Sequence, residues 1–233
     1  MTSHGRGRIY IHRGLKISVV IPCYNEEEGV RRVIGSLPGI VDEVVVVDNA
    51  STDRTGEVAR ELGAQVVLEK RRGYGAAYKA GLPAATGDVI VTLDGDGTYP
   101  AEQIPELVDH LEDRKLDFVS AARFPLTNPR AMSFSNKLGN LILTCAMLVL
   151  YGKPIRDSQS GMWVFRSRVL SRLELTSDGM PLSEEIKIEA IRAKGVAFGE
   201  YHVDYHPRVG EVKLDKWRDG FRNLAFLVKK RFR

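Results

Sequence analysis

The chain has 233 residues, of which 43% are hydrophobic and 27% are charged, and its formal net charge is +4. This length fits one large domain, and this composition is typical of a globular protein and excludes a disordered chain. The first fifteen residues lack the apolar segment of a secretory signal, and the longest apolar run, residues 138–151, is too short to span a bilayer. Cys23 and Cys145 lie within apolar runs, so we expect two buried free thiols in a reducing compartment.

Strands and helices alternate through the first half of the chain, after a tail over residues 1–14 that we expect to be flexible. Short β-branched runs predict strands over residues 17–22, 43–48, 64–68 and 89–93, and helical patterns fill the intervals between them. Such apolar strands alternating with helices predict an α/β fold with a mostly parallel sheet covered on both faces.

The second half continues with less regular spacing. The pattern predicts a helix after Pro100, strands over residues 116–121, 162–165 and 196–206, a helix through residues 183–191, and a basic amphipathic helix over residues 217–232. We therefore expect one domain over residues 15–210, followed by a basic amphipathic segment over residues 211–233. His202, Asp204 and His206 fall on one face of the last strand, which indicates either a zinc site or a solvated strand face.

Two aspartates follow the strand at residues 89–93, separated by one glycine. Because side chains at i and i+2 of an extended chain point the same way, Asp94 and Asp96 can reach one common point. Two hard carboxylates with few other ligands suit Mg²⁺ or Mn²⁺, whose remaining coordination comes from water and phosphate. The alternative is a polar turn, since Asp-Gly is ordinary turn chemistry.

Asp48 ends the second predicted strand, so it lies at the same edge of the sheet as the aspartate pair. This convergence favours nucleotide binding, with Asp48 accepting a hydrogen bond from a base or ribose. The alternative is that Asp48 only caps the helix that follows.

Residues 213–233 hold eight basic side chains against two aspartates. A clustered basic end indicates an anionic partner, either a membrane lipid, a nucleic acid or a phosphate-bearing substrate. The basic residues are not interleaved with the stacking aromatics of single-strand binders, so we expect no nucleic acid.

Four motifs in order carry a family likeness: VVIPCYNE at 19–26, VVDNASTD at 46–53, GYGAA at 73–77 and LDGD at 93–96. They resemble the successive motifs of family 2 glycosyltransferases with the GT-A fold. DSQSGM at 157–162 and RVGEVKL at 208–214 resemble the polyprenyl-phosphate sugar synthases, the group of dolichyl-phosphate mannose and glucose synthases. The chain departs from that group at Val212, where a serine is usual, and at Thr98 and Tyr99, where a glutamine is frequent.

The resemblance implies a metal-dependent, inverting transfer of a hexose from a UDP- or GDP-linked sugar to a polyprenyl or dolichyl phosphate. It also leaves open a family 2 enzyme that acts on a soluble or polysaccharide hydroxyl, and a third reading is a nucleotide-binding scaffold without activity. The implied location is cytoplasmic, peripherally on the cytoplasmic face of a membrane. Residues 141–150 and the C-terminal helix suit interfacial binding, although residues 141–150 also fit a core helix.

Residue roles follow from the same resemblance. Asp94 and Asp96 would hold the metal, and Asp96 and Arg208 would act on the diphosphate. Asp157 and Glu185 would hold sugar hydroxyls or act as a base; the alternative for both is that they only cap a helix or a loop. The implied donor-binding residues are Pro22, Tyr24, Asn25, Glu26, Asp48, Asn49, Ser51, Gly73, Asp94, Gly95 and Lys213. The implied acceptor-phosphate residues are Arg123, Arg130, and Ser133 or Ser135.

Overall fold

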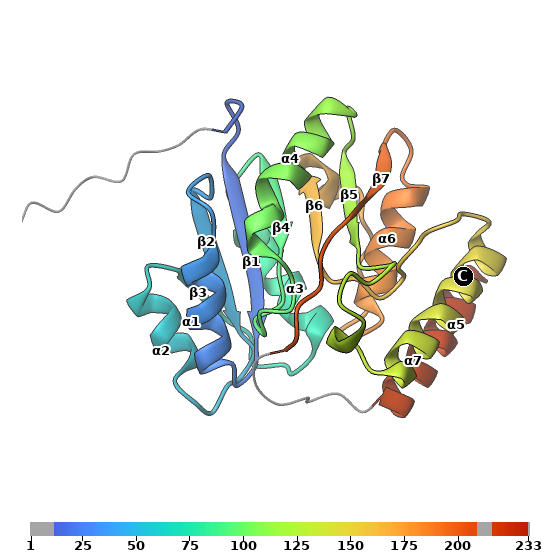
Figure 1. Ribbon diagram of the computed structural model, residues 1–233, viewed down its shortest axis with the longest axis horizontal. Helices are drawn as coiled ribbons and strands as arrows, with labels where there is room; N and C mark the ends of the chain where they lie inside the picture. Colours follow the sequence, from blue (N-terminus) through green and yellow to red (C-terminus); the bar gives the residue numbers. More distant parts are fainter. Residues whose placement is uncertain (1–11, 209–215, 233) are drawn as a thin grey trace, which may run out of the picture.

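The computed structural model describes residues 12–208 and 216–232 and is built around a seven-stranded sheet in the order β3-β2-β1-β4-β6-β5-β7 (Figure 1). The strands are β1 (Ile17–Cys23), β2 (Glu43–Asp48), β3 (Gln65–Leu68), β4 (Val89–Thr92), β5 (Phe118–Ala122), β6 (Trp163–Arg166) and β7 (Phe198–His202). Valine and isoleucine fill the central strands because β-branched side chains pack well on a pleated surface. The predicted α/β fold with a mostly parallel sheet is confirmed.

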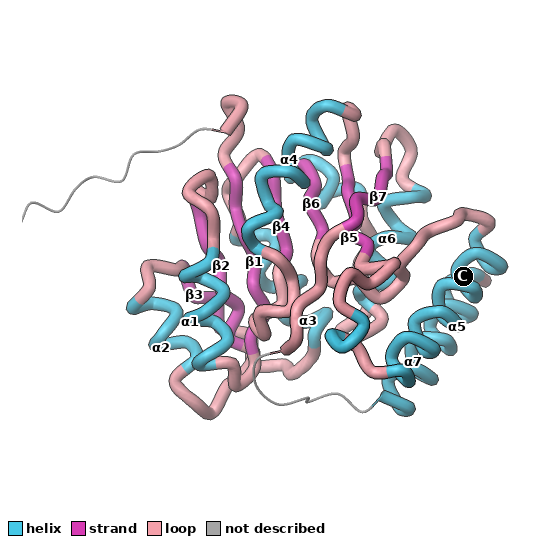
Figure 2. The backbone as a smooth tube through the Cα atoms, viewed as in Figure 1, coloured by secondary structure: helices cyan, strands magenta, loops and turns pink. Residues whose placement is uncertain are grey.

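Helices cover both faces of the sheet. One face packs against α1 (Glu27–Ser36), α2 (Thr55–Glu61) and α4 (Ile104–Asp113), and the other against α3 (Tyr74–Gly81) and α6 (Leu182–Arg192). Short 3₁₀ turns lie at η1 (Leu82–Ala84), η2 (Ala101–Gln103), η3 (Pro129–Ala131) and η4 (Ser167–Arg172). Figure 2 shows the sheet between these helical layers.

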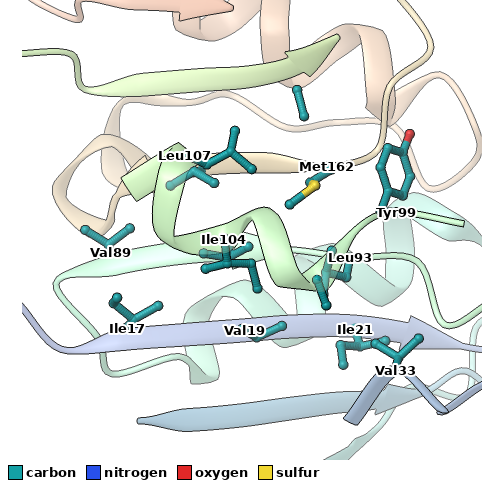
Figure 3. Packing of buried hydrophobic residues seen from close by; sticks show 14 of the residues in the cluster. Ile17, Val19, Ile21, Val33, Val89, Leu93, Tyr99, Ile104, Leu107 and Met162 are labelled. Atoms are coloured by element: carbon teal, nitrogen blue, oxygen red, sulfur yellow. The ribbon is translucent and has the colours of Figure 1, made fainter. Parts of the chain in front are cut away.

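Alternation along β1 builds the larger core. Ile17, Val19 and Ile21 point toward the layer of α1 and α4, where Ile104 and Leu107 pack against them (Figure 3). All five of these side chains are fully buried. Burial of an aliphatic side chain of this size contributes about 1.5–3 kcal/mol, so this layer anchors the strands that carry the site.

Strand direction decides which chain segments meet at the site. β1 pairs in parallel with β2 and β4, whereas β6 is antiparallel to both β4 and β5. β5 therefore runs in the same direction as β4, and β7 is parallel to β5. The residues that follow β1, β2, β4, β5 and β7 all emerge at one edge of the sheet.

A pair of helices, α5 (Phe134–Tyr151) and α7 (Lys216–Arg231), lies beside the sheet and packs against α6 (Figure 1). Ser133 caps the start of α5, and Gly152 ends it in the left-handed region with φ of +67°. Leu143, Met147 and Leu227 are buried between the helices with Ile188 of α6. The expected C-terminal amphipathic helix is therefore docked on the domain.

Three expectations differ from the structure. Cys145 is exposed on α5, whereas Cys23 is buried as predicted. His12 and Arg13 form a turn that pairs with Asp109 of α4, so the described end of the tail is attached to the domain.

The third difference concerns α5, which is four residues longer than the apolar run in the sequence because it begins at Phe134. Among the described residues it is the one helix long and apolar enough to cross a membrane by length and composition, and 17% of it is buried. By length and composition, the prediction that no segment is long enough to span a bilayer is therefore wrong.

Candidate active site

The aspartate pair stands at the carboxyl end of β4. Asp96 is buried, and its Oδ1 accepts hydrogen bonds from the backbone N–H and the hydroxyl of Thr98, at 3.0 and 2.7 Å. The hydroxyl of Tyr74, at the start of α3, donates to Asp94 Oδ1 at 3.2 Å. Each carboxylate therefore keeps one oxygen oriented by the protein, which orders the pair before any ligand binds.

The ionisation of Asp94 depends on its surroundings. Burial, followed by the negative charge of Asp96, raises the pKa of Asp94 to about 7. The Tyr74 hydroxyl and the positive charges of Arg123 and Arg208 oppose that rise. A cation between the two carboxylates would remove this repulsion.

Arg208 closes the site from the segment after β7. Its Nη1 lies 3.1 Å from Asp96 Oδ2, and its Nη2 donates to Glu26 Oε1 at 2.8 Å. The Arg208 Nε is buried and has no hydrogen-bond partner among the described residues. A guanidinium with a spare N–H beside a carboxylate pair can bind a second anion, such as a diphosphate oxygen.

The donor set fits a hard divalent cation. Asp94 and Asp96 offer only oxygen ligands, and no cluster of three or more His, Cys, Asp or Glu residues occurs within residues 12–208 and 216–232. Mg²⁺ and Mn²⁺ accept such sparse protein ligation because water and phosphate oxygens complete their coordination. The absence of such a cluster also rejects the zinc hypothesis for the described part of the chain.

The three residues of that hypothesis have separate partners. Strand β7 ends at His202, whose Nε2 lies 2.7 Å from the carbonyl oxygen of Pro125. Asp204 Oδ2 accepts from Gln103 at 3.3 Å, and His206 pairs with Glu102 at 3.2 Å.

Polar loops line the edge beside the metal carboxylates. Cys23 and Asp48 are partners in the parallel register, so Asp48 sits next to the end of β1. Its Oδ1 accepts from the backbone N–H of Ser51 at 2.9 Å, and the Ser51 hydroxyl accepts from the backbone of Asn25 at 3.0 Å. Asp48 thus braces its own turn and lies at the edge expected for nucleoside binding. It does not cap the helix that follows, because α2 begins at Thr55 without a side-chain cap hydrogen bond.

Asn49 fastens a second loop to this edge. Its Nδ2 donates to the carbonyl oxygens of Glu69 and Arg71, and its Oδ1 accepts from the backbone N–H of Gly73 at 2.8 Å. Gly73 has φ of +153°, and a Cβ there would lie 2.1 Å from the carbonyl oxygen of Asp178. Only glycine fits this position, which opens helix α3 toward the site.

The loop after β1 completes the donor side. Pro22 belongs to β1, and the Tyr24 ring faces the Arg72 guanidinium at 4.4 Å. A Cβ on Gly95 would lie 2.6 Å from the Cys23 sulfur, so the carboxylate loop packs directly on the end of β1. The predicted donor residues that the structure describes therefore gather at one edge, and Lys213 lies outside the described residues.

Arg123 differs from its predicted role as a ligand of the acceptor phosphate. Its Nε and Nη2 donate to the two carboxylate oxygens of Asp157 at 2.6 and 2.8 Å, and both residues are buried. Asn140 and the backbone of Gln159 also donate to Asp157, and the Arg123 charge helps to hold the pKa of Asp157 below its usual value. Asp157 is therefore a buried, fully bonded carboxylate and not an accessible base.

Glu185 also differs from its predicted role. Its carboxylate accepts from the backbone and hydroxyl of Thr176, from the backbone of Ser177, and from Lys230 of α7 at 2.9 Å. The side chain is fully buried. Glu185 fixes a loop and the C-terminal helix, so we assign it no chemical step.

The remaining acceptor residues lie together at the start of α5. Arg130 belongs to η3 and is exposed, and the hydroxyls of Ser133 and Ser135 are 3.1 Å apart. Ser133 Oγ accepts from the backbone N–H of Asn136 as the helix cap. A helix N-terminus with an arginine and hydroxyls beside it is a favourable place for a phosphate.

Sequence reasoning missed two residues that orient the metal carboxylates. Tyr74 holds Asp94, and Thr98 holds Asp96 through two hydrogen bonds. Tyr74 stands inside the GYGAA motif and Thr98 two residues after the aspartate pair, so both signals were visible. Their contacts depend on the packing of α3 and on the turn after β4, which the sequence does not show.

The sheet order, the helical layers and the carboxylate pair define an α/β enzyme of the GT-A fold class. The family model described as Glycosyl transferase family 2 matches residues 18–173. The chain therefore belongs to glycosyltransferase family 2 and is a glycosyltransferase.

Curated relatives are similar along most of the chain. A dolichyl-phosphate hexose transferase of Haloferax volcanii is 36% identical over 88% of this chain and 89% of its own length. The hexosyltransferase Agl6 of low-salt glycan biosynthesis, from the same organism, is 34% identical over 91% of this chain and 53% of its own length. A dolichol-phosphate mannosyltransferase of Pyrococcus furiosus is 31% identical over 78% of this chain and 55% of its own length. The chain thus spans about half the length of two of these relatives.

Solved structures share the fold. Glucosyl-3-phosphoglycerate synthase of Mycobacterium tuberculosis in complex with uridine diphosphate gives a TM-score of 0.76 at 24% identity, covering 99% of this chain and 87% of that chain. The same enzyme with Mn²⁺, uridine diphosphate and phosphoglyceric acid gives 0.74 at 25% identity, covering 94% of this chain and 79% of that chain. The predicted GT-A fold is confirmed by these similarities.

Proposed function

We propose that this glycosyltransferase moves a hexose from a nucleoside-diphosphate sugar, UDP- or GDP-linked, to a polyprenyl phosphate at a membrane surface. The observation that carries the proposal is the position of the phosphate-binding candidates. Arg130, Ser133 and Ser135 stand at the start of helix α5, and the outer face of that helix is apolar. A lipid that carries a phosphate needs both features side by side. The similarity to a dolichyl-phosphate hexose transferase supports the same acceptor class.

The outer face of the α5–α7 pair suits the surface of a bilayer. On α5 it exposes Phe134, Leu138, Leu141, Ile142, Leu148 and Val149, and toward the end of the chain Phe221, Val228 and Phe232. We call these nine residues the apolar face. Helix α5 has no carboxylate, α7 has one, and exposed cations flank the face at Arg218, Arg222, Lys229 and Arg231. This combination favours an anionic lipid surface.

Helix α5 lies on the membrane in this proposal and does not cross it. Its inner side packs on α6 and α7 through Leu143 and Met147, and Asn140 is buried beside Asp157. At a rise of about 1.5 Å per residue the helix measures about 27 Å, which barely matches a hydrocarbon core of about 30 Å. Insertion would also remove these contacts. We propose a peripheral location on this basis.

The residues divide the chemistry of transfer between them. Asp94 and Asp96 would hold Mg²⁺ or Mn²⁺, which when bound neutralises charge on the leaving diphosphate. Arg208 donates to the same developing charge through its guanidinium. Asp48, Asn49 and the loops they fasten bind and orient the nucleoside. A phosphate acceptor is already ionised at neutral pH, so the reaction needs no carboxylate base, and in-line attack on an α-linked donor gives a β-linked product.

A panel of donors and acceptors tests the proposal. The enzyme is incubated with UDP-glucose, UDP-N-acetylglucosamine or GDP-mannose and a short-chain polyprenyl phosphate, with Mg²⁺ or Mn²⁺, and products are scored by mass spectrometry. We expect a polyprenyl-phosphate hexose from one donor. Transfer only to free sugars or phosphoglyceric acid would replace the lipid acceptor with a soluble one.

A further inference from the structure

A buried amide contact joins the C-terminal helix to the loop behind the aspartate pair. Asn223 of α7 is 3% exposed, and its Nδ2 donates to Gln159 Oε1 at 2.8 Å. The Nε2 of Gln159 donates in turn to Glu184 Oε1 of α6 at 2.7 Å. The side chain of Gln159 is therefore held at both ends of its amide, between two helices.

The segment that carries Gln159, residues 157–161, is built against the site. The Gln159 backbone N–H donates to Asp157 Oδ1 and to Asn140 Oδ1, which ties it to the buried Arg123–Asp157 pair. Two residues later, the Gly161 N–H donates to the Tyr99 hydroxyl at 2.7 Å, and the Gly161 carbonyl accepts from Thr92 of β4.

Gly161 lies against Tyr74 and against one of the two metal carboxylates, Asp94. A Cβ on Gly161 would lie 2.4 Å from the Tyr74 hydroxyl and 3.2 Å from both carboxylate oxygens of Asp94. Residues 157–161 therefore pack directly against the Tyr74–Asp94 pair, with no room for a side chain at Gly161. Contacts therefore run from α7 through Gln159 and Gly161 to Asp94.

We propose that Asn223 is a positioning residue: by holding Gln159 it sets the position of residues 157–161, and so of Asp94, for transfer. The proposal rests on the proposed function, because α7 also carries part of the apolar face. The seating of α7 on the domain is thereby linked to the geometry of the site. Asn223 touches no substrate in this account and acts only through residues 157–161.

The test compares two variants that each remove one hydrogen bond from α7. Asn223→Leu keeps the shape of the side chain and removes its contact with Gln159. Tyr151→Phe removes the bond from the Tyr151 hydroxyl to the Leu227 carbonyl at 2.9 Å and leaves Gln159 untouched. Each variant removes one hydrogen bond that holds α7 on the domain, so a loss of stability shared by both is separated from a loss of position found only in Asn223→Leu.

Hydrogen exchange is the first readout because it needs no substrate. We expect amide exchange within residues 158–162 to become at least about fivefold faster in Asn223→Leu and to stay unchanged in Tyr151→Phe. The second readout is kinetic. We expect turnover to fall about tenfold in Asn223→Leu, while the Kd for UDP and GDP stays within about twofold of the parent, because misplacement acts on the reacting geometry.

Gln159→Leu supplies a second variant in case Asn223→Leu does not fold, and the double variant should lose no more turnover than either single one. Unchanged exchange in both single variants, or equal acceleration in Asn223→Leu and Tyr151→Phe, overturns the positioning role. If the parent enzyme transfers nothing to polyprenyl phosphate, the proposed function fails by itself, and the exchange data still decide the role of Asn223.

Discussion

Arg208 Nη1 lies 3.1 Å from Asp96 Oδ2, although the two residues are 112 positions apart in the chain. The same guanidinium also binds Glu26 at 2.8 Å, so one cation is shared by two carboxylates from different loops. The backbone of His206 donates to the Thr98 carbonyl at 2.9 Å and thereby holds the segment of Arg208 beside the turn of Asp96. Arg208 therefore pairs with Asp96 Oδ2, the carboxylate oxygen that is not bonded to Thr98.

Replacement of Arg208 should separate metal binding from turnover. In Arg208→Ala, Asp96 and Glu26 lose their shared cation, so Mn²⁺ without nucleotide should bind a few-fold more tightly, because it no longer competes with the guanidinium for Asp96. Transfer should fall at least about a hundredfold, because a donor to the leaving diphosphate is gone. Calorimetric titration with Mn²⁺ and a product assay check both directions. Weaker Mn²⁺ binding together with lost turnover would make Arg208 a structural residue only.

Asp96→Asn tests the requirement for a divalent cation. The amide keeps the shape of the side chain and its acceptor for Thr98, but removes the charge that a hard cation needs. Turnover should fall at least about a hundredfold, and excess chelator should abolish the activity of the parent. Asp113→Asn on α4 is the control, because this exposed carboxylate pairs with Arg13 at the surface. Full activity of the parent in chelator would contradict the metal assignment.

Asp157→Asn should destabilise the protein by about 3 kcal/mol, because it leaves the buried Arg123 guanidinium without its counter-ion. The pKa of Asp157 is lowered in the folded state, so its contribution is fully present above the unfolded pKa near 3.8 and is lost as the pH falls below that value. Urea unfolding from pH 7 to pH 3 should show a constant difference between parent and variant that narrows below pH 3.8. A difference that does not change with pH would assign the loss to packing.

The apolar face should decide binding to anionic vesicles. Leu141→Asp with Val149→Asp places two charges on side chains that are 58% and 82% exposed, so the fold should tolerate them. Flotation with phosphatidylglycerol vesicles should fall at least about tenfold, and salt should weaken the binding of the parent. Leu68→Asp is the matched control, since Leu68 is 58% exposed on β3 at the opposite edge of the sheet. Equal flotation of all three proteins would rule out this face as the membrane contact.

The carboxylate pair and the strands that carry it followed from local patterns. Spacing of two residues put Asp94 and Asp96 on one side of an extended chain, and apolar runs marked the strands that bring Asp48 to the same edge. Four short motifs in order indicated the family that the family model matches over residues 18–173. These features depend on periodicity and on residue type, which are local properties of the sequence.

Only the tertiary structure decided which charges are used inside the protein and which face outward. The sequence pattern predicted Arg123 and Glu185 as site residues. In the structure Arg123 is buried in a bidentate pair with Asp157, and Glu185 is buried in a pair with Lys230 of α7. Both partners come from distant elements, so the local sequence could not indicate them. Likewise, Cys145 looked buried within an apolar run, yet α5 rests on α6 and α7 by one side and exposes the other. The physical reason is the same in each case: burial and pairing depend on which surfaces meet, and a helix or strand pattern alone does not say which of its faces will be covered.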